Sequence, residues 1–77
     1  MQTEFSILMK FLREREGLSA RQLSAAAGLS ASYVSKVESG AVLPTIESFA
    51  KIVSKLYTTD REITYLISTL TREGEGS

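Results

Sequence analysis

Apolar residues recur every three or four positions along the first part of the chain. On a helical wheel they cluster on one side, at Phe5, Ile7, Leu8, Phe11 and Leu12. This spacing is typical of an amphipathic helix. Glycine adopts the left-handed conformation of a helix C-cap without strain. The pattern therefore predicts a first helix that ends at Gly17.

A capping box opens the second predicted helix. Ser19 is a good N-cap, and Gln22 follows three residues later, so that each side chain can bind the other's backbone amide. The helix is expected over residues 20–27, and Gly28 closes it. A helix this short is marginal alone, so it must pack against a neighbour.

The third predicted helix follows almost at once. Ser30 is its expected N-cap, and it ends near Gly40. Two short helices joined by the three-residue turn 28–30 have the arrangement of a helix-turn-helix unit. We therefore expect such a unit over about residues 19–39. Its inward contacts are expected at Leu23, Ala27, Val34 and Val37.

Two more helices complete the predicted fold. Thr45, directly after the only proline, caps the fourth, and Thr59 with Glu62 forms a second capping box that opens the fifth. No segment has the alternating pattern of a strand, so the predicted class is all-α, with one domain over residues 1–70. Residues 71–77, rich in Gly and Glu, are expected to form a flexible tail.

The outward face of the third helix is small and polar. With Val34 and Val37 toward the core, the wheel places on the opposite side Ser32, Ser35, Lys36 and Ser39. Short hydroxyl side chains let a helix come close to the floor of a DNA groove, and serine contacts any base with little discrimination. The pattern therefore favours DNA binding. An ordinary solvated face is the alternative.

Several of these motifs occur in one order and spacing that resembles a known family. They are LR at 12–13, GLS at 17–19 and 28–30, YVSKVESG at 33–40 and PTIESFAKIVSKL at 44–56. The chain resembles the lambda-repressor-like, or Xre, helix-turn-helix domain from about Phe5 to Ile63. The resemblance implies a five-helix bundle that binds double-stranded operator DNA as a symmetric dimer.

The resemblance also implies where DNA is contacted. Its base-contacting positions match Ala31, Ser32 and Lys36, and its positions at the start of the second helix match Ser19 and Ala20. The wheel, and the preference of helix N-termini for anions, add further residues. The complete predicted set is Ser19, Ala20, Arg21, Ser30, Ala31, Ser32, Tyr33, Ser35, Lys36 and Ser39.

Glu38 leans toward the core side of the third helix, where a carboxylate destabilises the fold unless it is paired. The resemblance implies a structural ion pair with Arg13. The wheel of the first helix places Arg13 away from the centre of the apolar face, so Arg15 remains a rival partner.

The fifth helix carries an apolar stripe with a tyrosine before it. The stripe either completes the bundle or forms a dimer interface. A two-fold dimer places its recognition helices about 34 Å apart and predicts a near-palindromic operator. The residues of this predicted interface are Tyr57, Ile63, Leu66, Ile67 and Leu70.

Composition excludes several classes of function. The chain has no Cys and no His, so the commonest metal ligand and general base are absent. We expect no enzyme, no metal and no cofactor. No apolar run is long enough to span a membrane and no signal segment opens the chain, so we expect a cytoplasmic protein.

The charge balance leaves two functions open. Nine basic residues balance nine acidic ones, which permits a locally basic face but not a strongly basic protein. Ala20 stands where the family usually has a long polar residue, and the apolar loop 41–43 stands where it often has Lys or Arg. A small operator-binding regulator is the main prediction, and a protein-interaction module with a protein partner is the alternative.

Overall fold

The computed structural model describes residues 2–75 of the chain. Within them it contains five helices and no strand, as the sequence predicts. The helices are α1 (Glu4–Arg15), α2 (Ala20–Ala26), α3 (Tyr33–Glu38), α4 (Ile46–Val53) and α5 (Asp60–Glu75).

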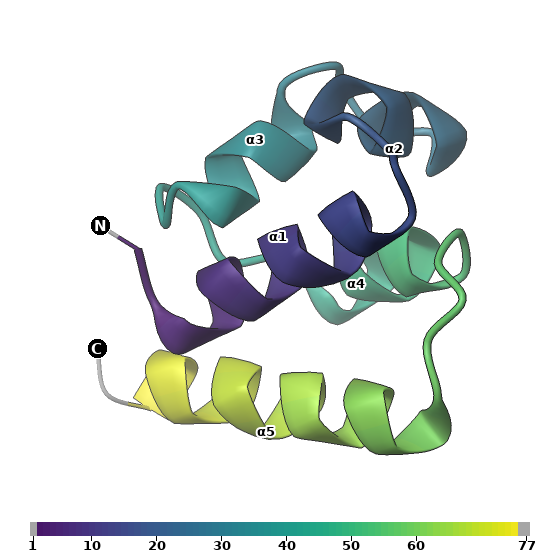
Figure 1. Ribbon diagram of the computed structural model, residues 1–77. Coiled ribbons are helices and arrows are strands. Elements are labelled where there is room, and N and C mark those ends of the chain that lie inside the picture. Colours follow the sequence, from purple (N-terminus) through teal and green to yellow (C-terminus); the bar gives the residue numbers. More distant parts are fainter. Residues whose placement is uncertain (1, 76–77) are drawn as a thin grey trace.

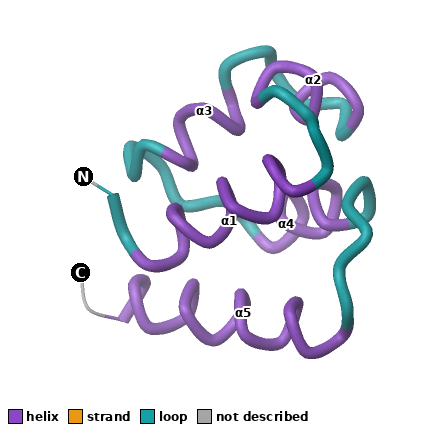
Figure 2. The backbone as a smooth tube through the Cα atoms, in the orientation of Figure 1, coloured by secondary structure: helices purple, strands orange, loops and turns teal. Residues whose placement is uncertain are grey.

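Helix α1 lies across the middle of the molecule (Figure 1). Helices α2 and α3 pack together on one side of it, α5 lies along the opposite side, and α4 lies behind it. Figure 2 shows that all connections between helices are short loops. The α2–α3 pair therefore projects from one side of the bundle, with α5 on the far side.

One core joins all five helices. Every helix contributes at least one side chain that is fully or almost fully buried: Phe5, Met9, Leu12, Leu23, Val34, Val37, Phe49, Ile52 and Leu66. The rings of Phe5 and Phe49 have centroids 6.0 Å apart, in a tilted aromatic contact between α1 and α4. This core holds α2 and α3, which are too short to be stable alone.

The predicted caps of three helices are confirmed. Ser19 Oγ accepts from the Gln22 amide at 3.0 Å, and Gln22 Oε1 accepts from the Ser19 amide at 2.8 Å. Thr59 and Glu62 form the same reciprocal pair at the start of α5. At α4, Thr45 Oγ1 accepts from the Ser48 amide at 3.1 Å.

Helix α3 begins later than the sequence predicts. The prediction of Ser30 as its N-cap is wrong, because residues 31 and 32 form a turn and the helix starts at Tyr33. Ser32 holds the N-cap position, and its side chain makes no capping hydrogen bond. The connection between α2 and α3 thus spans residues 27–32 rather than 28–30.

The cap of α3 comes instead from α2. The Ser24 hydroxyl is completely buried, accepts from the Val34 amide at 3.0 Å and donates to the Ala20 carbonyl at 2.9 Å. It therefore satisfies a backbone amide in the first turn of α3, which is the role that an N-cap side chain normally has. Because Ser24 lies ten residues before Val34, the local capping pattern did not reveal it.

The C-terminal part of the chain also differs from expectation. Helix α5 continues through Glu75, five residues beyond the predicted domain end at Leu70. Residues 76 and 77 of the predicted tail lie outside the described residues. The flexibility of the tail stays a prediction.

Ion pairs fasten α5 to α1. Arg15 contacts both carboxylate oxygens of Glu62, at 2.6 and 3.1 Å, and the hydrogen bond from Arg15 holds the pKa of Glu62 at about 2, below its ordinary value. At the other end of the pair of helices, Glu4 accepts from Arg72 at 3.0 Å and from the Tyr65 hydroxyl. The two helices are therefore joined near both ends.

The role of Ser24 predicts a specific loss of stability. Ser24→Ala leaves the buried Val34 amide without an acceptor, so it is expected to lower the free energy of unfolding by about 1–3 kcal/mol. Urea denaturation followed by circular dichroism measures the loss. Ser54→Ala is the matched control, because the exposed Ser54 hydroxyl, among the described residues, bonds only to the Lys51 carbonyl, and it should change stability by less than about 0.5 kcal/mol. Equal losses would contradict the capping role.

Candidate nucleic-acid interface

The helix-turn-helix unit is held from inside by the four residues that the sequence predicts. Leu23, Ala27, Val34 and Val37 are all buried. Gly28 follows α2 with φ +73°, the left-handed conformation that ends the helix and that other residues adopt at a cost. The relative placement of α2 and α3 is therefore set by side-chain packing and by this turn.

The exposed face of α3 matches the predicted stripe. Ser32, Ser35, Lys36 and Ser39 are exposed. The Ser39 hydroxyl donates to the Lys36 carbonyl at 3.0 Å, so its proton is engaged within its own helix. Ser32, Ser35 and Lys36 thus form the part of the face best placed to contact a ligand.

The other predicted contact residues fall at the start of α3 and of α2. Ser30 and Ala31 are exposed in the turn before α3, whereas Tyr33 is half-buried and packs against the core. At α2, Arg21 is exposed and Ala20 packs partly against the core. Ala20, at the start of α2, and Ser35, on the exposed face of α3, line one hollow together, so the start of α2 lies beside this face.

The amides at the start of α2 are only partly available. The capping box already engages the backbone amide of Ser19 and that of Gln22, together with the Ser19 hydroxyl. The amides of Ala20 and Arg21 lie between these two and take no part in the capping box. Any anion bound at this helix start would therefore depend on those two amides and on the Arg21 side chain.

Arg13 and Glu38 form the buried ion pair that the resemblance implies. Arg13 Nε lies 2.7 Å from Glu38 Oε2 and Nη2 lies 2.8 Å from Oε1, and Nη1 donates to the Leu18 carbonyl at 2.6 Å. The hydrogen bonds to Glu38 raise the pKa of Arg13. The rival Arg15 pairs with Glu62 instead. The pair thus fixes α3 against α1 and the loop before α2.

A polar hollow of about 300 Å³ opens beside α3. It is lined by Gln2, Lys10, Arg13, Ala20, Ser35, Glu38 and Ser39. Sequence reasoning missed Gln2 and Lys10, because on a helical wheel Lys10 is one of several exposed polar residues of the first helix. Only the packing of α1 against α3 brings Lys10 to the same hollow as Ser35.

The charges around α3 are unequal although the whole chain is neutral. The carboxylates of Glu38, Glu62 and Glu4 are paired with arginines. By contrast Lys10, Arg21 and Lys36 make no ion pair within the described part of the chain. Three cations around α3 are therefore without an ion-pair partner, and one carboxylate that also lacks an ion pair among the described residues, Glu14, lies one turn along α1 from Lys10.

The predicted dimer residues are divided by the structure. Leu66 is completely buried inside the monomer, so its inclusion in an interface was wrong. Ile63 and Leu70 are partly buried against the core, which shows that much of the stripe completes the bundle. Tyr57 and Ile67 are exposed, by 91% and 43%. Only these two remain freely available to a partner.

Comparison with known proteins decides the family. A family model described as "Helix-turn-helix domain" matches residues 4–66. The chain belongs to this family. The helix-turn-helix domain also matches the crystal structure of an arginine-to-alanine mutant of the restriction-modification controller protein C.Esp1396I. That match has a TM-score of 0.70 and 25% identity and covers 92% of this chain and 91% of that one. No curated protein sequence matches the chain.

The family and the structural likeness support a DNA-binding transcription regulator rather than an enzyme. None of the described helices is long and apolar enough to cross a membrane.

The buried pair predicts strong energetic coupling. Arg13→Ala and Glu38→Ala each leave one buried charge without a partner, so each is expected to lower the free energy of unfolding by about 3 kcal/mol or more. The double variant removes both charges, and its loss should be well below the sum. Urea denaturation of all four proteins measures the coupling. The same cycle on the exposed Arg15 and the half-buried Glu62 is the control and should show much weaker coupling, because water screens this pair far more than Arg13–Glu38. Additive losses at Arg13 and Glu38 would refute the coupling.

Proposed function

We propose that the protein is a small sequence-specific transcription regulator that occupies an operator by placing α3 in the major groove. The exposed face of α3 carries this proposal: it is small and polar, and it stands on a helix whose opposite side is locked by the core and by Arg13–Glu38. An α-helix about 10–12 Å across fits a major groove about 12 Å wide.

The contacts divide by chemistry. Ser32, Ser35 and Lys36 face base edges, where lysine favours guanine and serine accepts several bases. Ser30 and Ala31 meet the groove at the start of α3. Arg21 and the α2 amides meet a phosphate, which positions the domain without reading sequence. Specificity then comes from few direct contacts and from DNA shape.

We propose that two copies bind together, on a near-palindromic operator with half-sites about 34 Å apart. The exposed apolar side chains support this dimer. Tyr57 and Ile67 remain from the predicted interface, and Leu43 and Ile46, exposed by 46% and 71%, add apolar surface around the start of α4. One α3 helix with a single lysine offers little affinity, and a second copy doubles the contacts.

A protein-interaction module is the second candidate. The exposed loop residues Val42 and Leu43 and the small Ala20 favour it, because a basic loop and a long polar side chain would be expected of a strong DNA binder. In that case α3 or the loop would contact a protein partner.

Selection from random duplexes tests the two candidates. We expect the wild-type protein to enrich an inverted repeat. Lys36→Ala should relax the preference at one base position, with a loss of about 1–3 kcal/mol in binding the selected site. Arg21→Ala is the matched comparison. It should weaken binding to all DNA sequences alike, and it should lower the slope of log affinity against log salt concentration by about one. Absence of enrichment even at low salt would eliminate the DNA-binding proposal.

Sedimentation equilibrium tests the dimer. At micromolar concentration we expect a monomer–dimer equilibrium that shifts to the dimer on the selected duplex. Ile67→Glu should weaken self-association, because it places a charge in an apolar contact, while Glu14→Gln, at an exposed position of α1 outside these apolar residues, should not. A strictly monomeric protein, free and on DNA, would rule the dimer out.

A further inference from the structure

The hollow beside α3 is lined, mostly by polar residues, from four parts of the chain. Gln2 and Lys10 come from the N-terminal segment and α1, Ala20 from the start of α2, and Ser35 from the exposed face of α3. The Arg13–Glu38 pair, which is almost fully buried, forms its floor. The hollow is thus continuous with the face proposed to enter the DNA groove.

The charge of the hollow comes from Lys10. Glu38 is neutralised by two hydrogen bonds from Arg13, so the floor adds no net charge. Lys10 is exposed and makes no hydrogen bond or ion pair with any described residue. Glu14, one turn further along α1, does not line the hollow. Glu14 still acts electrostatically on Arg13, so the lining itself supplies one ammonium group without an ion-pair partner beside amide and hydroxyl groups, which suits an anion with several oxygens.

The place of the hollow identifies the anion. An α-helix nearly fills the width of a major groove, so elements that flank α3 meet the sugar–phosphate backbone at the groove edge rather than the bases. The hollow lies on one flank of α3, between this helix and α1. With the loop 41–43 apolar, a phosphate contact from another element adds affinity that this loop does not supply.

We infer that Lys10, assisted by Gln2, forms a binding site for one phosphate of the DNA strand that borders the groove occupied by α3. This inference rests on the proposed DNA-binding function and extends it to a residue outside the helix-turn-helix unit. Lys10 is a positioning contact: it orients α3 on the duplex and reads no base.

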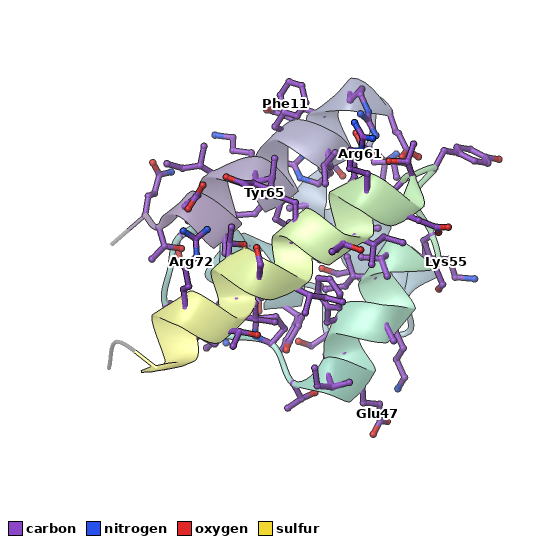
Figure 3. The ribbon with its side chains drawn as sticks, turned by 90° about the horizontal axis from the view of Figure 1, so that it is seen from below. Phe11, Glu47, Lys55, Arg61, Tyr65 and Arg72 are labelled. Carbon is purple, nitrogen blue, oxygen red and sulfur yellow. The ribbon has the colours of Figure 1, made fainter. Side chains whose placement is uncertain are left out.

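The salt dependence of binding to the selected duplex tests the site. Lys10→Ala should lower the slope of log affinity against log salt by about one and weaken all sequences alike. Lys10→Arg should restore the slope. Lys55→Ala is the control, because the exposed Lys55, two residues beyond the end of α4, does not line the hollow and projects from the edge of the molecule in Figure 3, and its removal should leave the slope unchanged. Thermal melting of each variant verifies folding.

Single methylphosphonate substitutions in the same duplex locate the phosphate. One substitution in each half-site should weaken the wild-type protein but not Lys10→Ala, because both changes remove the same contact. If every substitution affects both proteins equally, or if the salt slope of Lys10→Ala equals that of the wild type, the inference is wrong although the proposed function stands. If the wild-type protein binds no duplex, both fail together.

Discussion

The position of α3 depends on the buried ion pair between Arg13 and Glu38. Paired charges in a protein interior are tolerated only when nearly all their hydrogen-bonding groups are satisfied. Here the guanidinium group binds both carboxylate oxygens and the Leu18 carbonyl, so one arginine connects α1, the loop before α2 and α3. Because α3 has only six residues, its orientation comes from this contact and the core rather than from its own length.

The buried Ser24 hydroxyl completes the support of α3 from the side of α2. By accepting from the Val34 amide it takes over the capping role. Ser30 and Ser32 therefore have no capping duty in α3 and stay exposed. The serines in and near α3 thus have two different roles. Ser24 supports the helix from inside, and the others lie on its exposed surface.

The neutral net charge of the chain conceals an uneven surface. Arginines pair with Glu4, Glu38 and Glu62, which ties α1 to α5 and to α3. The cations that border α3 make no such pairs among the described residues, so they stay available to phosphates. A few free cations spread over three helices favour a domain that is positioned at several points and reads bases lightly.

Much of this protein follows from sequence alone. Helical spacing, the capping boxes at Ser19 and Thr59, and the glycine turns determine the five helices and the outward face of α3, because these signals act over three or four residues. Only the tertiary structure decides that Ser24 caps α3, that Leu66 belongs to the core and that Lys10 lines the same hollow as Ser35. Each of these depends on how helices far apart in the sequence pack together. The periodicity within one helix does not determine which side chain of another helix lies next to it.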